Sequence, residues 1–389
     1  MDATPDLPAI SPTDVARARM AVSIAFVLLG LATGVWAVHI PIIQARLGID
    51  AATLGFALFA MASGAVIAMP VTGWAVGRFG SRLPTTVLML SFPIFFTLPI
   101  LSGSVVFLFG AMVLFGATMS ALDVAGNVQA SEVERARGRP TMSSFHGFYS
   151  VGGLIGAAIS AGIVSAGFGD GRGAAAAAVL FLITAGLAVR HLYPSERPIW
   201  SAGPRFALPS RSVVSLGAIA FLCFAIEGAI GDWSALFLST VKLASASAAA
   251  IGFALYSCAM AFCRLTGDWV VSRLGGRVTV VLGGGLIALG MAIAILSPWA
   301  LVCSVGFGMV GIGAANVVPV VFSAASRARG VTPSYAIAAV TTLGYSGFMI
   351  APPLIGMISN AAGLSLGLWV VAIGGVIVAT IAASRQWSR

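Results

Sequence analysis

Charged residues are scarce in this chain of 389 residues: Asp, Glu, Lys and Arg make up 8% of it, against roughly 25% in ordinary soluble domains. Hydrophobic residues make up 59%. No hydrophilic stretch is long enough to fold as a separate soluble domain. A water-soluble protein could not bury so much apolar surface, so the composition excludes that class and predicts a chain that folds in a lipid bilayer.

Motifs for several other functions are also absent. The sequence contains no G-x-x-x-x-G-K-[ST] phosphate loop, which argues against ATP-driven transport. Its four cysteines form no C-x-x-C pair, so we expect buried thiols with no disulfide, no metal site and no cofactor. The three histidines are scattered along the chain, so we do not expect an enzyme. No cleavage motif follows the first apolar run, which we interpret as a retained helix.

What the sequence does contain is a series of apolar runs of about 20 residues, the length at which a helix crosses the hydrocarbon core. Together they predict an all-α membrane protein with twelve transmembrane helices. The predicted helices lie near residues 20–45, 53–76, 85–101, 104–130, 143–167, 173–190, 212–239, 247–271, 278–298, 300–326, 333–358 and 363–384. Only a short polar segment separates the third from the fourth, so one longer span there is the alternative.

A polar segment, Arg190–Arg211, divides the chain into two hydrophobic parts of nearly equal length. It contains four arginines and four prolines, and proline disfavours helix at the residue before it, so we interpret the segment as a linker. The predicted organisation is a cytoplasmic tail over residues 1–19, a six-helix bundle over 20–189, a cytoplasmic linker over 190–211 and a second six-helix bundle over 212–389.

The basic residues are concentrated in alternate loops. Seventeen of the 21 Lys and Arg residues fall in the tails, the linker and the loops expected on one side, three fall in loops on the other side, and Arg264 lies inside a span. Since positively charged loops remain in the cytoplasm, both termini are predicted to be cytoplasmic. The same placement argues against a nucleic-acid partner in spite of the net charge of +9.

Internal repeats relate the two halves of the sequence. The matching pairs are Trp74–Arg82 with Trp269–Arg277, Leu54–Phe59 with Ile251–Tyr256, Glu134–Gly138 with Ser326–Gly330, and Trp36 with Trp233. All are separated by nearly the same number of residues. Because six crossings return a chain to its starting side, these matches predict two six-helix halves in the same orientation, related by a pseudo-two-fold repeat, as in known transporters.

The two basic segments of this repeat resemble the signature loop of the major facilitator superfamily, G-x-x-x-D-R-x-G-R. The matching residues are Arg78, Gly80, Arg82, Arg273, Gly275 and Arg277. Gly77 and Ser272 replace the aspartate, and Asp268, one turn earlier, is a candidate substitute in the second half. The resemblance covers residues 20–385 and implies alternating access, with helices one, four, seven and ten lining a central cavity.

Three further segments resemble a bacterial inner-membrane group of this superfamily that is often labelled fucose-permease-like. They are A-L-D-V-A-G-N-V-Q-A-S-E-V-E, M-S-S-F-H-G and E-G-A-I-G-D-W-S-A. Some relatives in that group are linked to export of inositol-type compounds. The resemblance implies a location in the bacterial inner membrane.

Ionisable side chains inside membrane spans cost roughly 2.5–3.5 kcal/mol at a helix centre, so each of them indicates a function. Glu227, among apolar residues in the middle of the seventh helix, and Asp123 on the fourth are the candidate proton carriers. The alternatives are structural. Glu227 would then remain protonated or hydrogen-bonded, and Asp123 would pair with Arg264 or His146 in an inner gate.

The candidate solute-binding residues are polar and aromatic side chains on helices that would line the cavity. They are Trp36, His39, Asn127, Tyr149, Asp232, Trp233 and Asn316. Asn127 lies four residues after Asp123 and shares its helix face, together with Gln129. The two tryptophans suit stacking against a sugar-like ring, and anchoring in the outer leaflet is the alternative. For Asp232, the alternative is a solvated carboxylate at the outer mouth.

The candidate gating residues are Arg78, Arg82, His146, Arg264, Asp268, Arg273 and Arg277. Arg264 and Asp268 are four residues apart on one helix, and this spacing favours a structural ion pair between them. A gating role would require Arg264 to exchange partners between conformations. For His146, at the start of the fifth helix, simple hydrogen bonding is the alternative.

Together these features predict a monomeric, proton-coupled secondary active transporter that moves a small polar, sugar- or inositol-like solute by alternating access. Its partners would be the solute, protons and the bilayer. A proton-antiport exporter of amphipathic compounds is an alternative of the same class. A non-transporting membrane sensor is an alternative of another class, although the sequence contains no soluble output domain.

Overall fold

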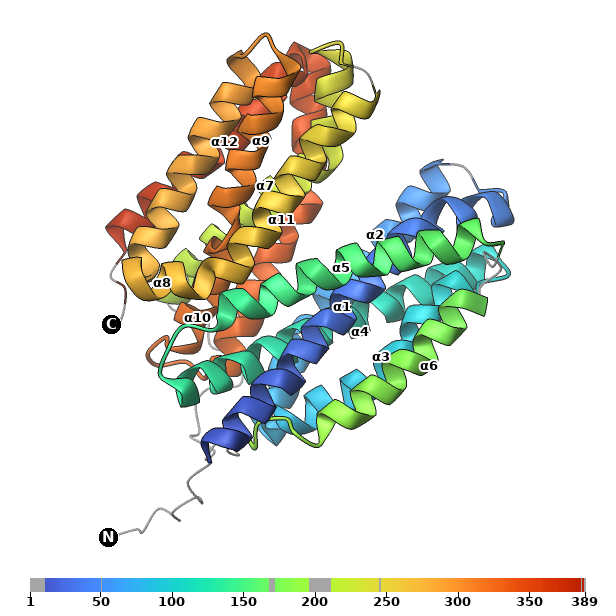
Figure 1. Ribbon diagram of the computed structural model, residues 1–389, viewed down its shortest axis with the longest axis vertical. Coiled ribbons are helices and arrows are strands. Elements are labelled where there is room, and N and C mark those ends of the chain that lie inside the picture. The colour runs from blue at the N-terminus through green and yellow to red at the C-terminus, as the bar shows by residue number, and fades with distance from the viewer. Residues whose placement is uncertain are drawn as a thin grey trace.

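The computed structural model describes residues 11–49, 51–167, 172–195, 211–244, 246–385 and 387. Every regular element in this part of the chain is a helix, which confirms the all-α class. The helices are α1 (Pro12–Leu47), α2 (Ala51–Phe79), α3 (Arg82–Ile100), α4 (Val105–Arg137), α5 (Met142–Ser165), α6 (Arg172–Val189), α7 (Arg211–Thr240), α8 (Ala246–Leu296), α9 (Ala300–Ala315), α10 (Val317–Ser326), α11 (Pro333–Ala362) and α12 (Leu364–Ser384). Figure 1 shows α1 to α6 and α7 to α12 as two separate bundles.

The first helix begins at Pro12, well before the predicted start near residue 20. Ser11 caps it, because its hydroxyl accepts a hydrogen bond from the amide of Asp14 at 3.1 Å. Proline at the first helical position loses no intrahelical hydrogen bond. The predicted tail of residues 1–19 is therefore helical over its last part, and residues 1–10 lie outside the described part of the chain. Residues 196–210 of the predicted linker lie outside it as well.

The long helix α8 contains two of the predicted membrane spans. Its apolar part, Ile251–Leu296, has 46 residues and would be about 69 Å long as one straight helix, against roughly 30 Å for the hydrocarbon core. Gly275 interrupts it with φ 75°, and Gly80, between α2 and α3, has φ 79°. Both are glycines of the repeated signature segment, at a backbone conformation that glycine adopts without strain.

Whereas α8 contains two predicted spans, α9 and α10 together make up a single predicted span. They form a single apolar stretch, Ala300–Ser326, interrupted at Asn316. Among the described residues, ten helices are long and apolar enough to cross a membrane, and Gly173–Val189 is a shorter apolar helix. With α8 divided at Gly275, these amount to the twelve predicted spans. The third and fourth spans are separate helices, α3 and α4.

The sequence repeat is visible in equivalent contacts of the two halves. Arg46 donates hydrogen bonds to the carbonyl oxygens of Ile100 and Ser102, at 2.6 and 2.9 Å. Lys242 donates to those of Ile295 and Ser297, at 2.9 and 2.6 Å. In each half a cation thus satisfies free carbonyl groups at the end of the third span. The two halves are built to the same plan.

Close packing of helices follows the same repeat. A Cβ atom added at Gly116 would lie 1.9 Å from the carbonyl oxygen of Met61, and one added at Gly311 would lie 2.4 Å from that of Tyr256. These contacts join the second and fourth spans of each half. Small residues allow such close approach of helices in membranes, where van der Waals packing contributes much of the association energy.

Gly116→Ala is therefore expected to destabilise the protein by about 1–3 kcal/mol, because the added methyl group overpacks the interface. Gly110→Ala on the same helix is the matched control, because an added Cβ there meets nothing within 4 Å. The thermal unfolding midpoints of both variants in the same detergent check this expectation. Equal midpoints would contradict the role assigned to Gly116.

The two halves meet near the end that carries the arginine-rich loops after α2, α4, α10 and the break in α8; we call it the arginine-rich end. Gly77 of α2 lies against Ser334 and Tyr335 of α11, and Gly147 of α5 lies against Leu265 of α8. In Figure 1 the two bundles converge towards this end and diverge towards the other, which we call the opposite end.

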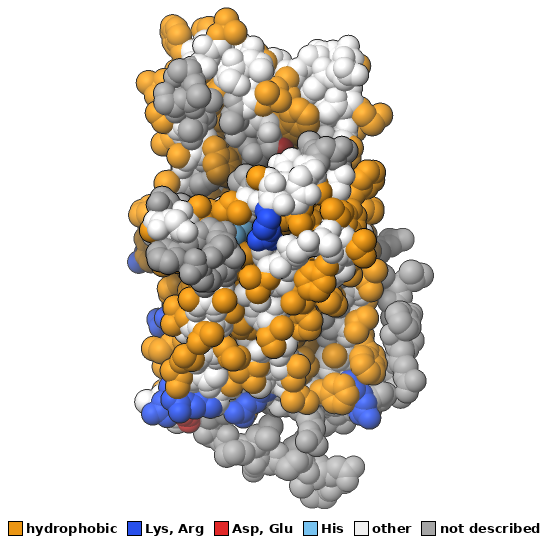
Figure 2. Space-filling view, turned by 90° about the vertical axis from the view of Figure 1, so that its right-hand side faces the viewer, with side chains coloured by type: hydrophobic (Ala, Val, Ile, Leu, Met, Phe, Trp, Pro, Cys, Tyr) orange, Lys and Arg blue, Asp and Glu red, His pale blue; other side chains and the backbone are white. Residues whose placement is uncertain are grey.

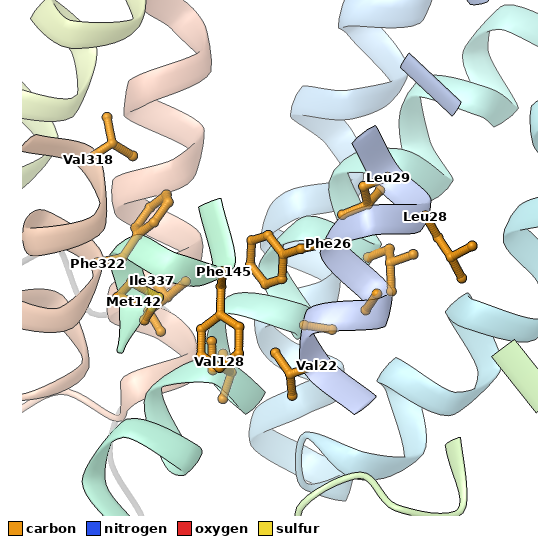
Figure 3. Packing of buried hydrophobic residues seen from close by; sticks show 14 of the residues in the cluster. Val22, Phe26, Leu28, Leu29, Val128, Met142, Phe145, Val318, Phe322 and Ile337 are labelled. Atoms are coloured by element: carbon orange, nitrogen blue, oxygen red, sulfur yellow. The ribbon is translucent and has the colours of Figure 1, made fainter. Parts of the chain in front are cut away.

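One hydrophobic core extends across this contact. It includes Phe26 of α1 and Phe145 of α5, whose ring centroids are 5.7 Å apart. Phe322 of α10 and Ile337 of α11 belong to the same core. Figure 3 shows these side chains gathered between the elements of the two halves. Apolar packing therefore holds the halves together at the arginine-rich end.

The outer surface has the distribution expected of a membrane protein. Figure 2 shows hydrophobic side chains over most of the flank and Lys and Arg side chains gathered at the lower edge. Large apolar residues such as Met357, 72% exposed, would be unfavourable in water but suit contact with lipid. The chain is a multi-pass membrane protein.

Candidate functional site

An ion pair lies in the middle of the second half. The guanidinium Nη2 of Arg264, on α8, donates to Oε1 of Glu227, on α7, at 2.9 Å. The two side chains are only 7% and 15% exposed. A buried ion pair is tolerated when the remaining donors are also satisfied. The other donors of Arg264 therefore determine what this pair can do.

A proline provides one of the acceptors. Pro319 of α10 has no amide hydrogen for the carbonyl of Ala315, the residue four positions before it, and the helix is interrupted between them at Asn316. The Nε of Arg264 donates to this carbonyl at 3.2 Å. The broken tenth span thus supplies a polar group to the site, as irregular backbone in membrane proteins often does.

The third guanidinium nitrogen of Arg264 reaches the first half. Its Nη1 donates to the hydroxyl of Ser150, on α5, at 3.2 Å. Ser150 in turn donates to the carbonyl oxygen of His146 at 3.2 Å. This single link connects the Glu227–Arg264 pair to the polar groups of α4 and α5.

Those polar groups end at a second carboxyl group. Nε2 of His146 lies 3.2 Å from Oδ1 of Asn127, which can only accept a hydrogen bond, so the imidazole donates it. Asn127 donates to Oδ1 of Asp123 at 3.0 Å. No cation within the described residues forms an ion pair with Asp123. The buried polar chain, from Asp123 through Asn127, His146, Ser150 and Arg264 to Glu227, therefore has one ion-paired and one unpaired carboxyl group.

Two phenols accompany the polar chain. Tyr149 of α5 lies with its hydroxyl 3.1 Å from Oγ1 of Thr33. Tyr149 and Tyr345 of α11 both lie near Asp123 and Glu227. Tyr345 also packs edge-on against Phe224, with ring centroids 5.4 Å apart. Tyr345 is not among the residues predicted from the sequence, because nothing in the sequence placed it beside the carboxyl groups.

The predicted ion pair between Arg264 and Asp268 is wrong. Although the residues are four apart on α8, Arg264 turns to Glu227, and Oδ1 of Asp268 accepts a hydrogen bond from the backbone amide of Ser144 at 3.1 Å. Ser144 lies in the first turn of α5, in the other half, where free amides and the helix dipole favour a negative charge. Two better partners outside α8 thus outcompete the local pair.

Glu134, at the end of α4, is a further residue that the sequence analysis missed. Its Oε2 accepts hydrogen bonds from the amides of Thr141 and Met142, at 2.8 and 2.9 Å. Its Oε1 accepts from Ser323 and from Arg327 of the second half, the latter at 3.3 Å. The repeat E-R-A-R-G drew attention to this segment, but only the folded structure shows that Glu134 joins the two halves.

The sequence profile of the Major Facilitator Superfamily matches residues 22–333. The chain belongs to this superfamily. An uncharacterised MFS-type transporter of Yersinia pestis is 37% identical over 95% of both chains, and the membrane protein MosC of Rhizobium meliloti is 34% identical over 92% of this chain and 88% of its own.

The fold is also that of solved superfamily structures. The crystal structure of FucP, the E. coli fucose:proton symporter, in the outward conformation superposes with a TM-score of 0.74 at 14% identity. The match covers 95% of this chain and 99% of that one. It confirms the predicted architecture of twelve transmembrane helices.

The superfamily signature residues make contacts inside their own halves. Arg82 donates to the carbonyl oxygen of Arg190 at 3.1 Å, and its repeat mate Arg277 donates to that of Ala383. Each contact ties the start of a half's third span to the end of its sixth. Arg78 lies over the ring of Phe79, and Arg273 lies over that of Trp269.

Two predicted solute-binding residues of α1 lie in the core of the first half. Trp36 is 6% exposed and packs edge-on against Phe115, with ring centroids 5.8 Å apart. His39 is 4% exposed, and its Nδ1 lies 2.8 Å from the carbonyl oxygen of Val35 and 3.5 Å from Ser160 Oγ. Neither side chain offers a free surface to a solute. The two residues are three apart on α1, and the face that they share is turned towards the core.

The remaining predicted residues are dispersed. Asp232 is exposed. Trp233 is half-buried, and its ring would lie 3.6 Å from a Cβ atom added at Gly356. Asn316 donates to the carbonyl oxygen of Cys263 at 3.1 Å. Gln129 does not share the face of Asn127; it binds Ser81 at 2.6 Å and the carbonyl of Tyr193 at 3.0 Å. Of the predicted set, the structure brings together Asp123, Asn127, His146, Tyr149, Glu227 and Arg264.

Proposed function

We propose that this superfamily member is a proton-coupled secondary transporter that moves a small polar solute by alternating access. The observation that carries the proposal is the buried polar chain between Asp123 and Glu227. Buried ionisable groups in a membrane are costly and mark solute or proton pathways. The polar chain has one part in each half, and among the described residues only the hydrogen bond between Arg264 and Ser150 joins the two parts.

That division suits alternating access. Glu227 and Arg264 both belong to the second half, and Asp123, Asn127 and His146 all belong to the first. When one half rotates against the other, the two parts can separate without breaking the ion pair. Only the Arg264–Ser150 bond within the polar chain must break. Superfamily members are built for such relative movement of their halves.

Asp123 is the better candidate for the proton carrier. Arg264 stabilises the carboxylate of Glu227 directly, whereas Asp123 receives only the amide of Asn127. A carboxyl group without a neighbouring cation binds a proton at lower electrostatic cost than an ion-paired one. We therefore assign proton transfer to Asp123 and assign Glu227 the role of counter-ion to Arg264.

The solute would bind between the two carboxyl groups. Tyr149 and Tyr345 supply an aromatic face and a hydroxyl group from each half, a combination suited to a neutral, hydroxyl-rich ring. Since Arg264 and Glu227 neutralise each other, the site offers no free cation to an anionic solute. FucP, a fucose:proton symporter, has the same fold. We propose a sugar- or polyol-like solute.

This proposal is tested in liposomes that contain the purified protein and a pH-sensitive dye. Addition of the correct sugar or polyol is expected to produce a saturable proton flux that depends on the solute. A panel of hexoses, deoxysugars and inositols provides the solutes, and protein-free liposomes are the control. Solute exchange without any proton movement would reject proton coupling while retaining transport.

We further propose that the arginine-rich end lies in the cytoplasm, which follows from the positive-inside rule. The structure is then closed on the cytoplasmic side, through Glu134 and Asp268 among other contacts. Both carboxylates accept hydrogen bonds from the first turn of α5. Opening towards the cytoplasm requires the contacts of Asp268 with Ser144 and of Glu134 with Ser323 and Arg327 to break.

Cysteine labelling tests this orientation. In a variant without the four native cysteines, Leu243→Cys at the opposite end is expected to react with a membrane-impermeant maleimide in intact cells. Arg329→Cys, at the arginine-rich end, is expected to react only after permeabilisation. Both positions are exposed. A cysteine in the linker should behave as Arg329→Cys does, and the reverse pattern would overturn the orientation.

A further inference from the structure

A cavity of about 1000 Å³ lies on the outside of the first half, away from the buried polar chain. One face of α1 forms its wall, from Pro12 through Arg19 to Val27. These residues recur at three- and four-residue spacing and extend for about 22 Å along the helix. The remaining wall comes from Phe148 of α5 and from the end of α4 and the loop after it.

The cavity has a basic end and an apolar end. Arg19, Arg137 and Arg139 line it near the arginine-rich end, whereas Ile24, Val27 and Phe148 line the part deeper in the membrane span. Among the described residues that line it, none is acidic. Met20, whose side chain is 67% exposed, lies on its edge, so the cavity is open along the surface that faces lipid.

Arg19 and Arg137 make few hydrogen bonds to protein groups in the described part of the chain. Nε of Arg19 is buried and has no hydrogen-bond partner in the described part of the chain, and its Nη2 reaches Ser144 only at 3.4 Å. Arg137 donates to Thr141 at 3.0 Å. Arg137 is also repelled by Arg19 and Arg139, which carry the same charge, and attracted by the carboxylate of Asp268. An anion between them would remove this repulsion and satisfy the free donors.

We propose that this cavity binds an anionic phospholipid, with the phosphate of the headgroup between Arg19, Arg137 and Arg139 and an acyl chain along α1. A phosphate accepts hydrogen bonds from several guanidinium groups at once. Basic pockets between membrane helices at the cytoplasmic side bind such headgroups in other proteins. The apolar wall distinguishes this ligand from a free anion, which would gain nothing from Ile24, Val27 and Phe148.

The position of the cavity links the lipid to the contact between the halves. Arg19 and Asp268 bind the same residue, Ser144, through its hydroxyl and its amide respectively. A lipid that fixes Arg19 beside the first turn of α5 therefore supports the helix start that Asp268 of the second half contacts. Lipid binding should accordingly favour the conformation closed at the arginine-rich end.

Native mass spectrometry of the detergent-solubilised protein tests the proposal by binding alone, so its outcome does not depend on transport. The probes are dioleoyl-phosphatidylglycerol, dioleoyl-phosphatidylcholine and inorganic phosphate. Phosphatidylglycerol is expected to remain bound, phosphatidylcholine is not, and millimolar phosphate should not displace the lipid. The double variant Arg19→Gln/Arg139→Gln is expected to bind phosphatidylglycerol about thirtyfold more weakly, since each arginine contributes roughly 1 kcal/mol to such binding.

The matched control is Arg17→Gln/Arg135→Gln, which removes two charges from the same two segments but from residues that do not line the cavity. It should bind the lipid as the wild type does, and Arg19→Lys/Arg139→Lys should retain part of the binding. Equal loss in both Gln variants would reduce the effect to surface charge and overturn the site. Equal retention of phosphatidylcholine, or displacement by phosphate, would overturn the anionic-lipid assignment. Unchanged unfolding midpoints in lipid-free detergent exclude misfolding of the variants.

Discussion

Asp123→Asn is expected to reduce gradient-driven solute accumulation to the level of protein-free liposomes, while solute exchange without a gradient continues. Asparagine retains the size of the side chain and its hydrogen-bonding capacity but cannot release a proton. Its partner Asn127 can still pair with it after an amide rotation, so the polar chain to His146 should persist. Accumulation and counterflow exchange, measured on the same preparation, separate coupling from binding.

The matched control is Asp232→Asn, which removes an exposed carboxyl group outside the polar chain. It should leave proton coupling intact, with at most weaker solute binding. If Asp123→Asn accumulates solute at the wild-type rate while Glu227→Gln does not, the proton carrier is Glu227. If both variants accumulate solute normally, proton coupling does not pass through the buried polar chain.

Arg264→Met is expected to destabilise the protein by about 3–5 kcal/mol and to abolish transport, because it leaves the carboxylate of Glu227 buried without its counter-ion. It also removes the donors to Ser150 and to the carbonyl of Ala315. The double variant Arg264→Met/Glu227→Met should regain most of that stability, since an apolar pair of similar volume can replace a buried ion pair. Transport should remain absent, because the link between the halves is not restored.

Unfolding midpoints of the wild type, both single variants and the double variant form a double-mutant cycle that measures the coupling between the two side chains. Arg17→Met is the control for loss of a surface ion pair: Arg17 is 63% exposed and pairs with Asp14 at 3.3 Å. Its effect should stay within roughly 1 kcal/mol. Additive effects of the two single substitutions would contradict a stabilising pair between Glu227 and Arg264.

The contacts at the arginine-rich end are not equivalent in the two halves. On one side Asp268 of α8 binds the amide of Ser144 at the start of α5. In the other half, Gly73 is the repeat mate of Asp268, and Gly77, one turn later on α2, packs directly against Ser334 and Tyr335 at the start of α11. The start of α5 is thus contacted by a carboxylate, whereas the start of α11 packs closely against the backbone of α2. The glycine that replaces the family aspartate makes this second contact possible.

Much of the fold could be predicted because it depends on local properties of the sequence. The length of the apolar runs, the spacing of the repeats and the glycines of the signature segment indicated twelve spans in two equivalent halves. The start of α1 was predicted incorrectly, because hydropathy marks the part of a helix that lies in lipid. It does not mark the part beyond, which Ser11 and Pro12 begin.

The candidate site was predictable only in part. The free-energy cost of burying a charge identified Asp123, Glu227 and Arg264 as candidate functional residues, because that cost can be assigned to a residue without knowing its neighbours. Their partners do depend on neighbours. Arg264 has an acid four residues away in sequence, yet it pairs with Glu227, 37 residues distant. For Trp36 and His39, the rotation of α1 decided that their shared face is turned inwards.

The sequence by itself therefore determined that the chain spans a bilayer twelve times, that its halves are repeats, and which few charges must be satisfied inside the membrane. Hydrophobic length, periodicity and charge content are properties of single segments, so they are present before any segment meets another. The tertiary structure alone decided which charges pair, that Glu134 and Asp268 join the halves, and that three arginines surround a cavity beside α1. These features depend on contacts between helices. The packing of the apolar faces fixes the rotation of each helix and thereby determines which side chains meet.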